Sequence, residues 1–286
     1  MMRSTTSTVL LGPRAAWHIA GALAAAAVLI TWLGRCTDLD LVLADAMFDA
    51  ATGRFPWRHT WLTQTFNHGI LKALLLLAGA GFMLAALRDA WRGRAGGAAD
   101  PRQMRLRLRL RIVALSALLV PLATGALKQA SVAHCPWDLA RYGGAQPYVR
   151  LFEALPPGAV AGHCLPAGHA SGALWLVALA VFWLPTRPRT AGAVAALALA
   201  FGAAVGWLQQ LRGAHFMTHT LWSMWIACAL ASGLAVVMPW WSARRAHQTS
   251  ATNRQRFALT TQAQPPGRPG PRPISADTSG TTARVR

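Results

Sequence analysis

Five of the nine histidines in this chain fall within two stretches that border apolar segments. They are His134, His163, His169, His215 and His219. Lys128, one of only two lysines, and Arg212 lie in the same stretches. An imidazole can attack phosphorus or transfer a proton near neutral pH, and a cation beside it can neutralise phosphate oxygens. These residue types therefore indicate phosphate chemistry.

The segment Pro166–His169 has the composition of a helix start that can hold an anion. The first backbone N–H groups of a helix are unpaired, and the positive end of the helix dipole lies there. Gly168 would allow a ligand to approach the backbone closely. We therefore expect Gly168 to contact phosphate next to His169.

A metal site is the alternative chemistry. His215 and His219 are spaced like zinc ligands on one helix face, and His134, His163 and His169 could complete a set. No HExxH glutamate is present, however, and Lys128 and Arg212 would repel a cation. The sequence therefore favours a reaction with no metal and no cofactor.

The elements that must position these residues are apolar enough to cross a membrane. Hydrophobic residues make up 54% of the chain and charged residues 13%. A span needs about 20 residues to cross a hydrocarbon core of roughly 30 Å. Six segments approach or reach this length: Ala15–Leu33, Gly69–Leu87, Ile112–Leu127, Ala170–Leu184, Ala191–Leu208 and Thr220–Trp241. We expect an all-α fold, a polytopic membrane bundle of six transmembrane helices.

The chain has a net charge of +19, and the distribution of its basic residues predicts which side of the membrane each loop faces. Basic residues fill the gaps between apolar runs instead of lining one amphipathic face, which argues against a nucleic-acid partner. With both termini cytoplasmic, 20 of the 28 basic residues lie inside. The outside loops are then 34–68, 128–169 and 209–219, and the histidine cluster faces outward.

This topology predicts three parts. A cytoplasmic N-terminus covers residues 1–14, a membrane domain covers 15–241, and a basic, disordered cytoplasmic tail covers 242–286. The acidic, amphipathic stretch Leu39–Ala51 predicts a surface helix over the site. Alternatively, the first apolar segment is a cleaved signal peptide, because it is rich in alanine behind Arg3 and Arg14.

The residues in the last two outside loops resemble the three-part signature of the type 2 phosphatidic acid phosphatase superfamily. That signature reads K-x6-R-P, P-S-G-H and S-R-x5-H-x3-D. Here its parts are Lys128-x6-Cys135-Pro136, Pro166-Ala167-Gly168-His169 and a third part ending His215-x3-His219. The resemblance covers roughly Ile112–Trp241 with motifs and the first two spans by topology only.

The resemblance implies a role for each histidine. His215 would be the nucleophile that takes the phosphoryl group, and His169 would protonate the leaving group. Lys128 and arginines would hold the phosphate, and no metal would be needed. His219 occupies the position of the aspartate that orients the nucleophile.

Several family positions are altered in this chain. Cys135 replaces the first-motif arginine, Ala167 the second-motif serine, and Gln209 stands at the third-motif arginine position. Arg212, three residues nearer His215, is the expected replacement, with Arg141 as a helper for the first motif. Asp138 is a second candidate to orient His215. The sequence therefore predicts a divergent branch with compensating residues, or a site that has lost catalysis.

Cys135 and Cys164 each adjoin a motif in a loop that should face an oxidising compartment. A disulfide between them would hold the first motif against the second. The alternative is two free, buried thiols.

Together these features predict a membrane lipid phosphatase that acts on a lipid phosphate or pyrophosphate through a phosphohistidine. The expected location is the inner membrane of a bacterium, with the site facing the periplasm. A phosphotransferase with the same intermediate, or a lipid-binding relative without catalysis, is the alternative. The sequence predicts neither the lipid nor the oligomeric state.

Overall fold

The computed structural model describes residues 9–94 and 100–262, and the regular elements within these ranges are all helical. The α-helices are α1 (Pro13–Cys36), α2 (Leu39–Met47), α3 (Lys72–Arg94), α4 (Pro101–Gln129), α5 (Gly168–Leu174), α6 (Pro188–Leu211) and α7 (Met217–Gln262). A π-helix covers Trp61–Leu71, and 3₁₀-helices cover Pro136–Asp138, Ala140–Tyr142 and Trp175–Phe182. The prediction of an all-α fold is confirmed for the described residues.

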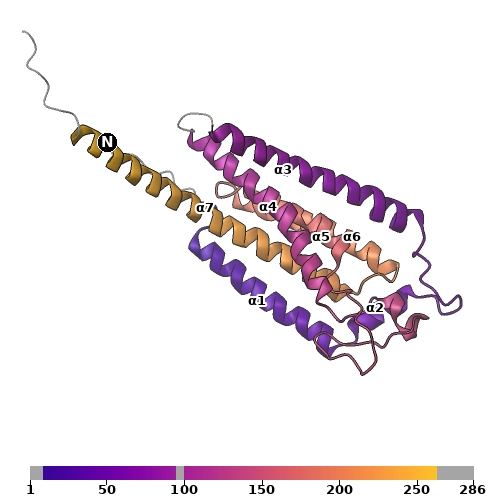
Figure 1. The fold of residues 1–286 in the computed structure, drawn as a ribbon. Coiled ribbons are helices and arrows are strands. Elements are labelled where there is room, and N and C mark those ends of the chain that lie inside the picture. The colour runs from indigo at the N-terminus through magenta and orange to yellow at the C-terminus, as the bar shows by residue number, and fades with distance from the viewer. Residues whose placement is uncertain (1–8, 95–99, 263–286) are drawn as a thin grey trace, which may run out of the picture. The chain divides into compact units, whose positions relative to one another are not determined.

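Within residues 9–94 and 100–262, five helices are long and apolar enough to cross a membrane. They are Pro13–Cys36, Trp61–Arg92, Arg102–Gln129, Pro188–Leu211 and Met217–Ser242. Each contains one predicted span and extends past it at both ends. In Figure 1, α1, α3, α4, α6 and the first part of α7 run side by side, with α2 among the loops at one end.

The remaining predicted span, Ala170–Leu184, is shorter than the others. The segment Gly168–Phe182 has seven α-helical residues followed by eight in a 3₁₀-helix. It rises about 26 Å, because a 3₁₀-helix rises ~2.0 Å per residue and an α-helix ~1.5 Å. Arg109, near the start of α4, donates a hydrogen bond of 2.6 Å to the carbonyl of Leu184. The segment therefore runs back along α4 to the end opposite Lys128.

The apolar side chains of the outer helices face outward. Leu29 and Trp32 on α1, and Leu74 and Leu77 on α3, are each more than half exposed. A soluble protein rarely exposes so much contiguous apolar surface. The buried core lies instead among α4, α5, α6 and α7, around Trp175. This distribution fits a helical membrane bundle whose outer helices contact lipid.

The surface helix predicted over Leu39–Ala51 is shorter than expected. It ends at Met47, where Phe48 takes an extended backbone conformation. Phe48 then packs edge-on against Phe55 and Tyr142, with ring centroids 5.2 Å apart in each pair. This aromatic cluster turns the chain and ends α2.

The last helix is longer than expected. The sequence predicts disorder after Arg244, but α7 continues to Gln262. Neither glycine nor proline interrupts residues 240–264, and the alanines, arginines and glutamines there favour helix. Residues 242–286 form a unit separate from the one that ends at Trp241. Residues 263–286 of the predicted tail lie outside the described ranges.

Candidate active site

The second motif is attached to the start of the last helix by two hydrogen bonds. The backbone N–H of Ala167 donates to the carbonyl of His219 (3.1 Å), and Ser223 Oγ donates to the carbonyl of Ala167 (3.0 Å). Ala167 is fully buried by these contacts. His169 and His219, far apart in the sequence, therefore lie on adjoining helix ends.

The disulfide predicted between Cys135 and Cys164 is present, with Cα atoms 5.3 Å apart. Cys164 Sγ also lies 3.4 Å from His215 Nδ1. A disulfide sulfur has no hydrogen to donate, so this is a packing contact. The bridge thus joins the first-motif loop to the second motif and forms a wall against which His215 packs.

His215 lies in the loop before α7 and is only 4% exposed. Burial lowers the pKa of His215 well below its usual range. Positive charge on His219, Lys128 or His169 lowers this pKa further, while a hydrogen bond with the backbone of Cys164 opposes the shift. These groups are therefore within electrostatic reach of His215, whose imidazole is uncharged and has a free lone pair.

His169 is the second residue of α5 and packs against a histidine that the sequence did not single out. The ring centroids of His68 and His169 are 4.1 Å apart. His169 Nε2 is buried and has no hydrogen-bond partner among the described residues. His68 lies in the π-helix, four residues before Lys72, and this spacing on one helical face was the available signal.

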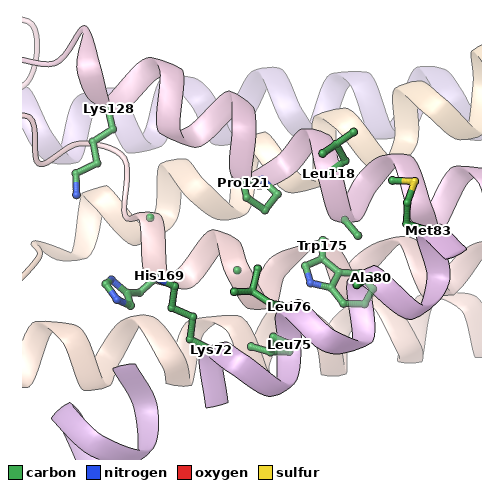
Figure 2. Close-up of a pocket in the computed structure, with 14 residues that line it drawn as sticks. Lys72, Leu75, Leu76, Ala80, Met83, Leu118, Pro121, Lys128, His169 and Trp175 are labelled. Carbon is green, nitrogen blue, oxygen red and sulfur yellow. The ribbon is translucent and has the colours of Figure 1, made fainter. Parts of the chain in front are cut away.

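A groove of about 470 Å³ starts beside Lys128 and His169 and continues between α3, α4 and α5. Figure 2 shows Lys72, Lys128 and His169 at one end, and Leu118, Met83 and Trp175 toward the other. Its lining is Lys72, Leu75, Leu76, Gly79, Ala80, Met83, Ala117, Leu118, Pro121, Lys128, Gly168, His169, Gly172 and Trp175. The groove therefore has a cationic end, and the rest of its lining is mainly apolar.

Gly168, predicted to contact phosphate, lines this groove. A Cβ at this position would meet no protein atom within 4 Å, so the backbone there is open to a ligand. The α-helical part of α5 has only seven residues. Lys72 and Lys128 are thus the clearer source of positive charge for the groove.

Arg212 is buried at the C-terminal end of α6. Its Nη1 donates to Gln209 Oε1 at 3.4 Å, so the glutamine at the motif-arginine position contacts the predicted replacement. The Arg212 guanidinium lies 5.6 Å from the Trp137 ring, and Arg58 lies 4.7 Å from the same ring. Burial, and then the charge of Arg58, lowers the pKa of Arg212. Arg58, which the sequence did not single out, joins this cationic group.

Arg141, the predicted helper for the first motif, is engaged elsewhere. Its Nε and Nη2 donate to the two carboxylate oxygens of Asp45 on α2, at 2.8 and 2.6 Å. Both side chains are exposed. That prediction was wrong, because the paired guanidinium is held at the surface. Asp138, the second orienting candidate, lies in a turn in which its carbonyl accepts N–H groups of Ala145 and Gln146.

Among the described residues, one group of three side chains brings possible metal-ligand atoms within 4.8 Å of one another: Cys135, Cys164 and His215. The two sulfurs are bonded to each other, so they do not offer the thiolates that bind metals. The five-histidine metal set considered from the sequence is not assembled in the described ranges.

These observations define a helical membrane protein whose cationic, histidine-rich site suits a phosphate group. The model of the PAP2 superfamily matches residues 109–244, the region that carries all three motifs. This match confirms the resemblance drawn from the motifs over that part of the chain. The PAP2 superfamily implies phosphatase or phosphoesterase activity. No curated protein and no solved structure matches the chain.

The disulfide has a measurable consequence for stability. Replacing Cys135 and Cys164 together with serine should lower the free energy of unfolding by about 3–4 kcal/mol, because the bridge closes a loop of intermediate length. The double variant should also lose activity, because His215 packs on Cys164. Thermal unfolding in detergent and peptide maps with and without reductant measure these effects. The matched control replaces the two free cysteines, Cys36 and Cys228, and should behave like the wild type.

Proposed function

We propose that this protein is a membrane lipid phosphatase that forms a phosphohistidine on His215. The groove carries the proposal, because its cationic end adjoins the histidines and its length is apolar. A lipid phosphate has two matching parts, a charged headgroup for the cationic end and hydrocarbon chains for the apolar part of the groove. A water-soluble phosphate ester would make no contact with the apolar part.

In the proposed reaction, Lys128 and Arg212 hold the phosphate oxygens. His215 Nδ1 contacts the disulfide, so Nε2 is the nitrogen that attacks phosphorus. The phosphorus–oxygen bond to the lipid breaks as the nitrogen–phosphorus bond forms. His169, which enters this step as an imidazolium whose charge the bound phosphate balances, donates its proton to the leaving oxygen. His169 is suited to this role because its Nε2 has no partner among the described side chains.

Water then completes the proposed cycle. His169, now neutral, takes a proton from a water that attacks the phosphohistidine, and the nitrogen–phosphorus bond breaks. Inorganic phosphate leaves, and both histidines return to their starting states. If a lipid hydroxyl replaces the water, the same intermediate gives phosphotransfer, which appears as a labelled lipid instead of free phosphate.

We also propose that Gly168–Phe182 is a sixth crossing and that both termini of the membrane domain are cytoplasmic. The hydrogen bond between Arg109 and Leu184 supports this, since it joins two segments of the arginine-rich side. The resulting parts are the N-terminus 1–14, the phosphatase domain 15–241 and the basic segment 242–286. The site then faces the periplasm of a bacterial inner membrane, in agreement with a disulfide beside His215.

Narrowing the apolar part of the groove tests the lipid substrate. Gly172 lines the groove, and a Cβ there would meet no atom within 4 Å, so Gly172→Leu should place its side chain where a lipid chain lies. We expect kcat/KM for long-chain phosphatidic acid to fall about 10–100-fold. Activity on p-nitrophenyl phosphate should stay within about 3-fold, since its small group needs no apolar contact.

Gly81→Leu is the matched control. Gly81 lies on α3, is exposed and does not line the groove, so its substitution should leave both activities unchanged. Equal losses on the two substrates in Gly172→Leu would contradict a lipid-binding groove. A wild-type protein that releases phosphate from no lipid phosphate would contradict the proposed function itself.

A further inference from the structure

A second, much smaller cavity lies on the α2 side of the last helix. Its volume is about 20 Å³, and its polar lining consists of Asp40, His134, Tyr148, Thr218 and His219. A water molecule needs at least about 10–15 Å³ of such space and two to four polar partners. The cavity therefore has room for one water.

The histidines of this cavity have unsatisfied nitrogens. His134 and His219 are 6% and 4% exposed. His134 Nε2 and His219 Nδ1 are buried, and neither has a hydrogen-bond partner among the described residues. Burying such a group without a partner costs roughly 1–3 kcal/mol, so a bridging molecule between them is favoured.

Asp40 supplies a buried carboxylate to the same cavity. It is 4% exposed and lies in the first turn of α2. Its Oδ1 accepts the backbone N–H of Thr218 at 3.0 Å, and its Oδ2 accepts the hydroxyl of Thr218. Each carboxylate oxygen can accept a further hydrogen bond. Burial raises the pKa of Asp40, while the bonds from Thr218 oppose this shift.

We propose that one water in this cavity connects Asp40 to His219 Nδ1, and that Asp40 thereby replaces the orienting aspartate that the third motif lacks. Asp40 is then a positioning residue, which acts through His219 on the nucleophile. The inference rests on the proposed role of His215. It identifies a carboxylate from outside the three motifs that makes the altered third motif workable.

The contact between His219 and His215 completes the connection. Their ring centroids lie 5.8 Å apart with an angle of 67° between the rings, so one ring presents its edge to the other. The His219 ring also hydrogen-bonds the backbone of Cys164, and it does so through the nitrogen other than Nδ1, because Nδ1 has no partner among the described residues. With that nitrogen donating, Nδ1 accepts a hydrogen bond from the water, whose second hydrogen goes to Asp40, and the tautomer is fixed. The fixed ring in turn limits the orientations open to His215.

A double-mutant cycle with p-nitrophenyl phosphate tests the connection. Asp40→Asn should lower kcat about 10–100-fold, the usual loss when a group that orients an active residue is removed, with KM nearly unchanged. His219→Asp restores the family residue and provides the second background of the cycle, in which kcat is measured relative to His219→Asp itself. In the His219→Asp background, Asp40→Asn should cost less than about 3-fold.

The alternative is that Asp40 only caps the start of α7. In that case Asp40→Asn costs the same factor in both backgrounds, and the inference is overturned. His134→Leu provides a second variant that leaves the bonds between Asp40 and Thr218 intact. It should lower kcat several-fold in the wild-type background and have no effect beside His219→Asp.

Asp45→Asn is the matched control on α2, since the Asp45 carboxylate pairs with Arg141 at the surface. It should leave kcat unchanged. If the wild type is active and His215→Ala is not, yet Asp40→Asn behaves like the wild type, the positioning role fails and the proposed function stands. If His215→Ala retains full activity, the proposed function fails first.

Discussion

Replacing His215 with alanine is expected to lower phosphate release from lipid phosphates by at least about 10⁴-fold. No other described side chain can take its place on the disulfide wall, because His219 is held on α7 and His169 faces the groove. Release of inorganic phosphate measures the loss. Brief incubation with ³²P-labelled substrate should also label the wild type at an acid-labile, base-stable site and leave His215→Ala unlabelled.

The physical basis of this prediction is the charge state of His215. Burial, and then neighbouring positive charge, lowers the pKa of this imidazole well below its usual range. The ring is consequently neutral at physiological pH, and its lone pair is available without a separate base. The nucleophile therefore requires positioning more than activation, in agreement with its packing against Cys164.

His163→Asn is the control for the loss of a histidine. His163 is exposed, lies next to Cys164 and has a positive φ of 49°, which asparagine tolerates well. The phosphatase activity of His163→Asn should stay within about 2-fold of the wild type. An unlabelled but fully active His215→Ala would refute the phosphohistidine. Equal inactivity of the wild type and His215→Ala on every lipid would instead favour a lipid-binding relative without catalysis.

The residues of the site that lie in short sequence motifs could be predicted from the sequence. Lys128, His169 and His215 stand at the ends of apolar segments, and the positions of those ends follow from hydropathy and charge. The disulfide was also predictable, since each cysteine adjoins a motif in an outside loop. Local patterns thus identified the residues at which α4, α5 and α7 meet.

Contacts over long sequence distances could not be predicted in this way. Asp40 binds Thr218 from another helix, 178 residues away, and no local pattern indicates this pair. His68, in the π-helix, contacts His169 on α5, and its spacing from Lys72 indicates a shared face but not this partner. The groove likewise depends on side chains from α3, α4, α5 and the 3₁₀-helix that begins at Trp175.

Replacing His169 with alanine should slow two steps, the phosphorylation of His215 and the hydrolysis of the phosphohistidine. The effect on the first step should depend on the leaving group of the substrate. A lipid alkoxide needs a proton as it departs, so phosphorylation of His215 by phosphatidic acid should slow about 10²–10⁴-fold. p-Nitrophenolate leaves readily without a proton. With p-nitrophenyl phosphate, the variant should therefore release about one nitrophenol per protein in a rapid burst and then turn over slowly, because water activation also needs His169.

Rapid-mixing measurements of nitrophenol and of ³²P-labelled protein distinguish this role from simple phosphate binding. If His169 only held the phosphate, the variant would phosphorylate His215 slowly from both substrates and show no burst. His163→Asn, with its ring also removed, should retain wild-type kinetics in both steps. Accumulation of labelled protein in His169→Ala would indicate that His169 acts both before and after the phosphohistidine forms. It is then the acid that protonates the leaving lipid oxygen and the base that takes a proton from the attacking water.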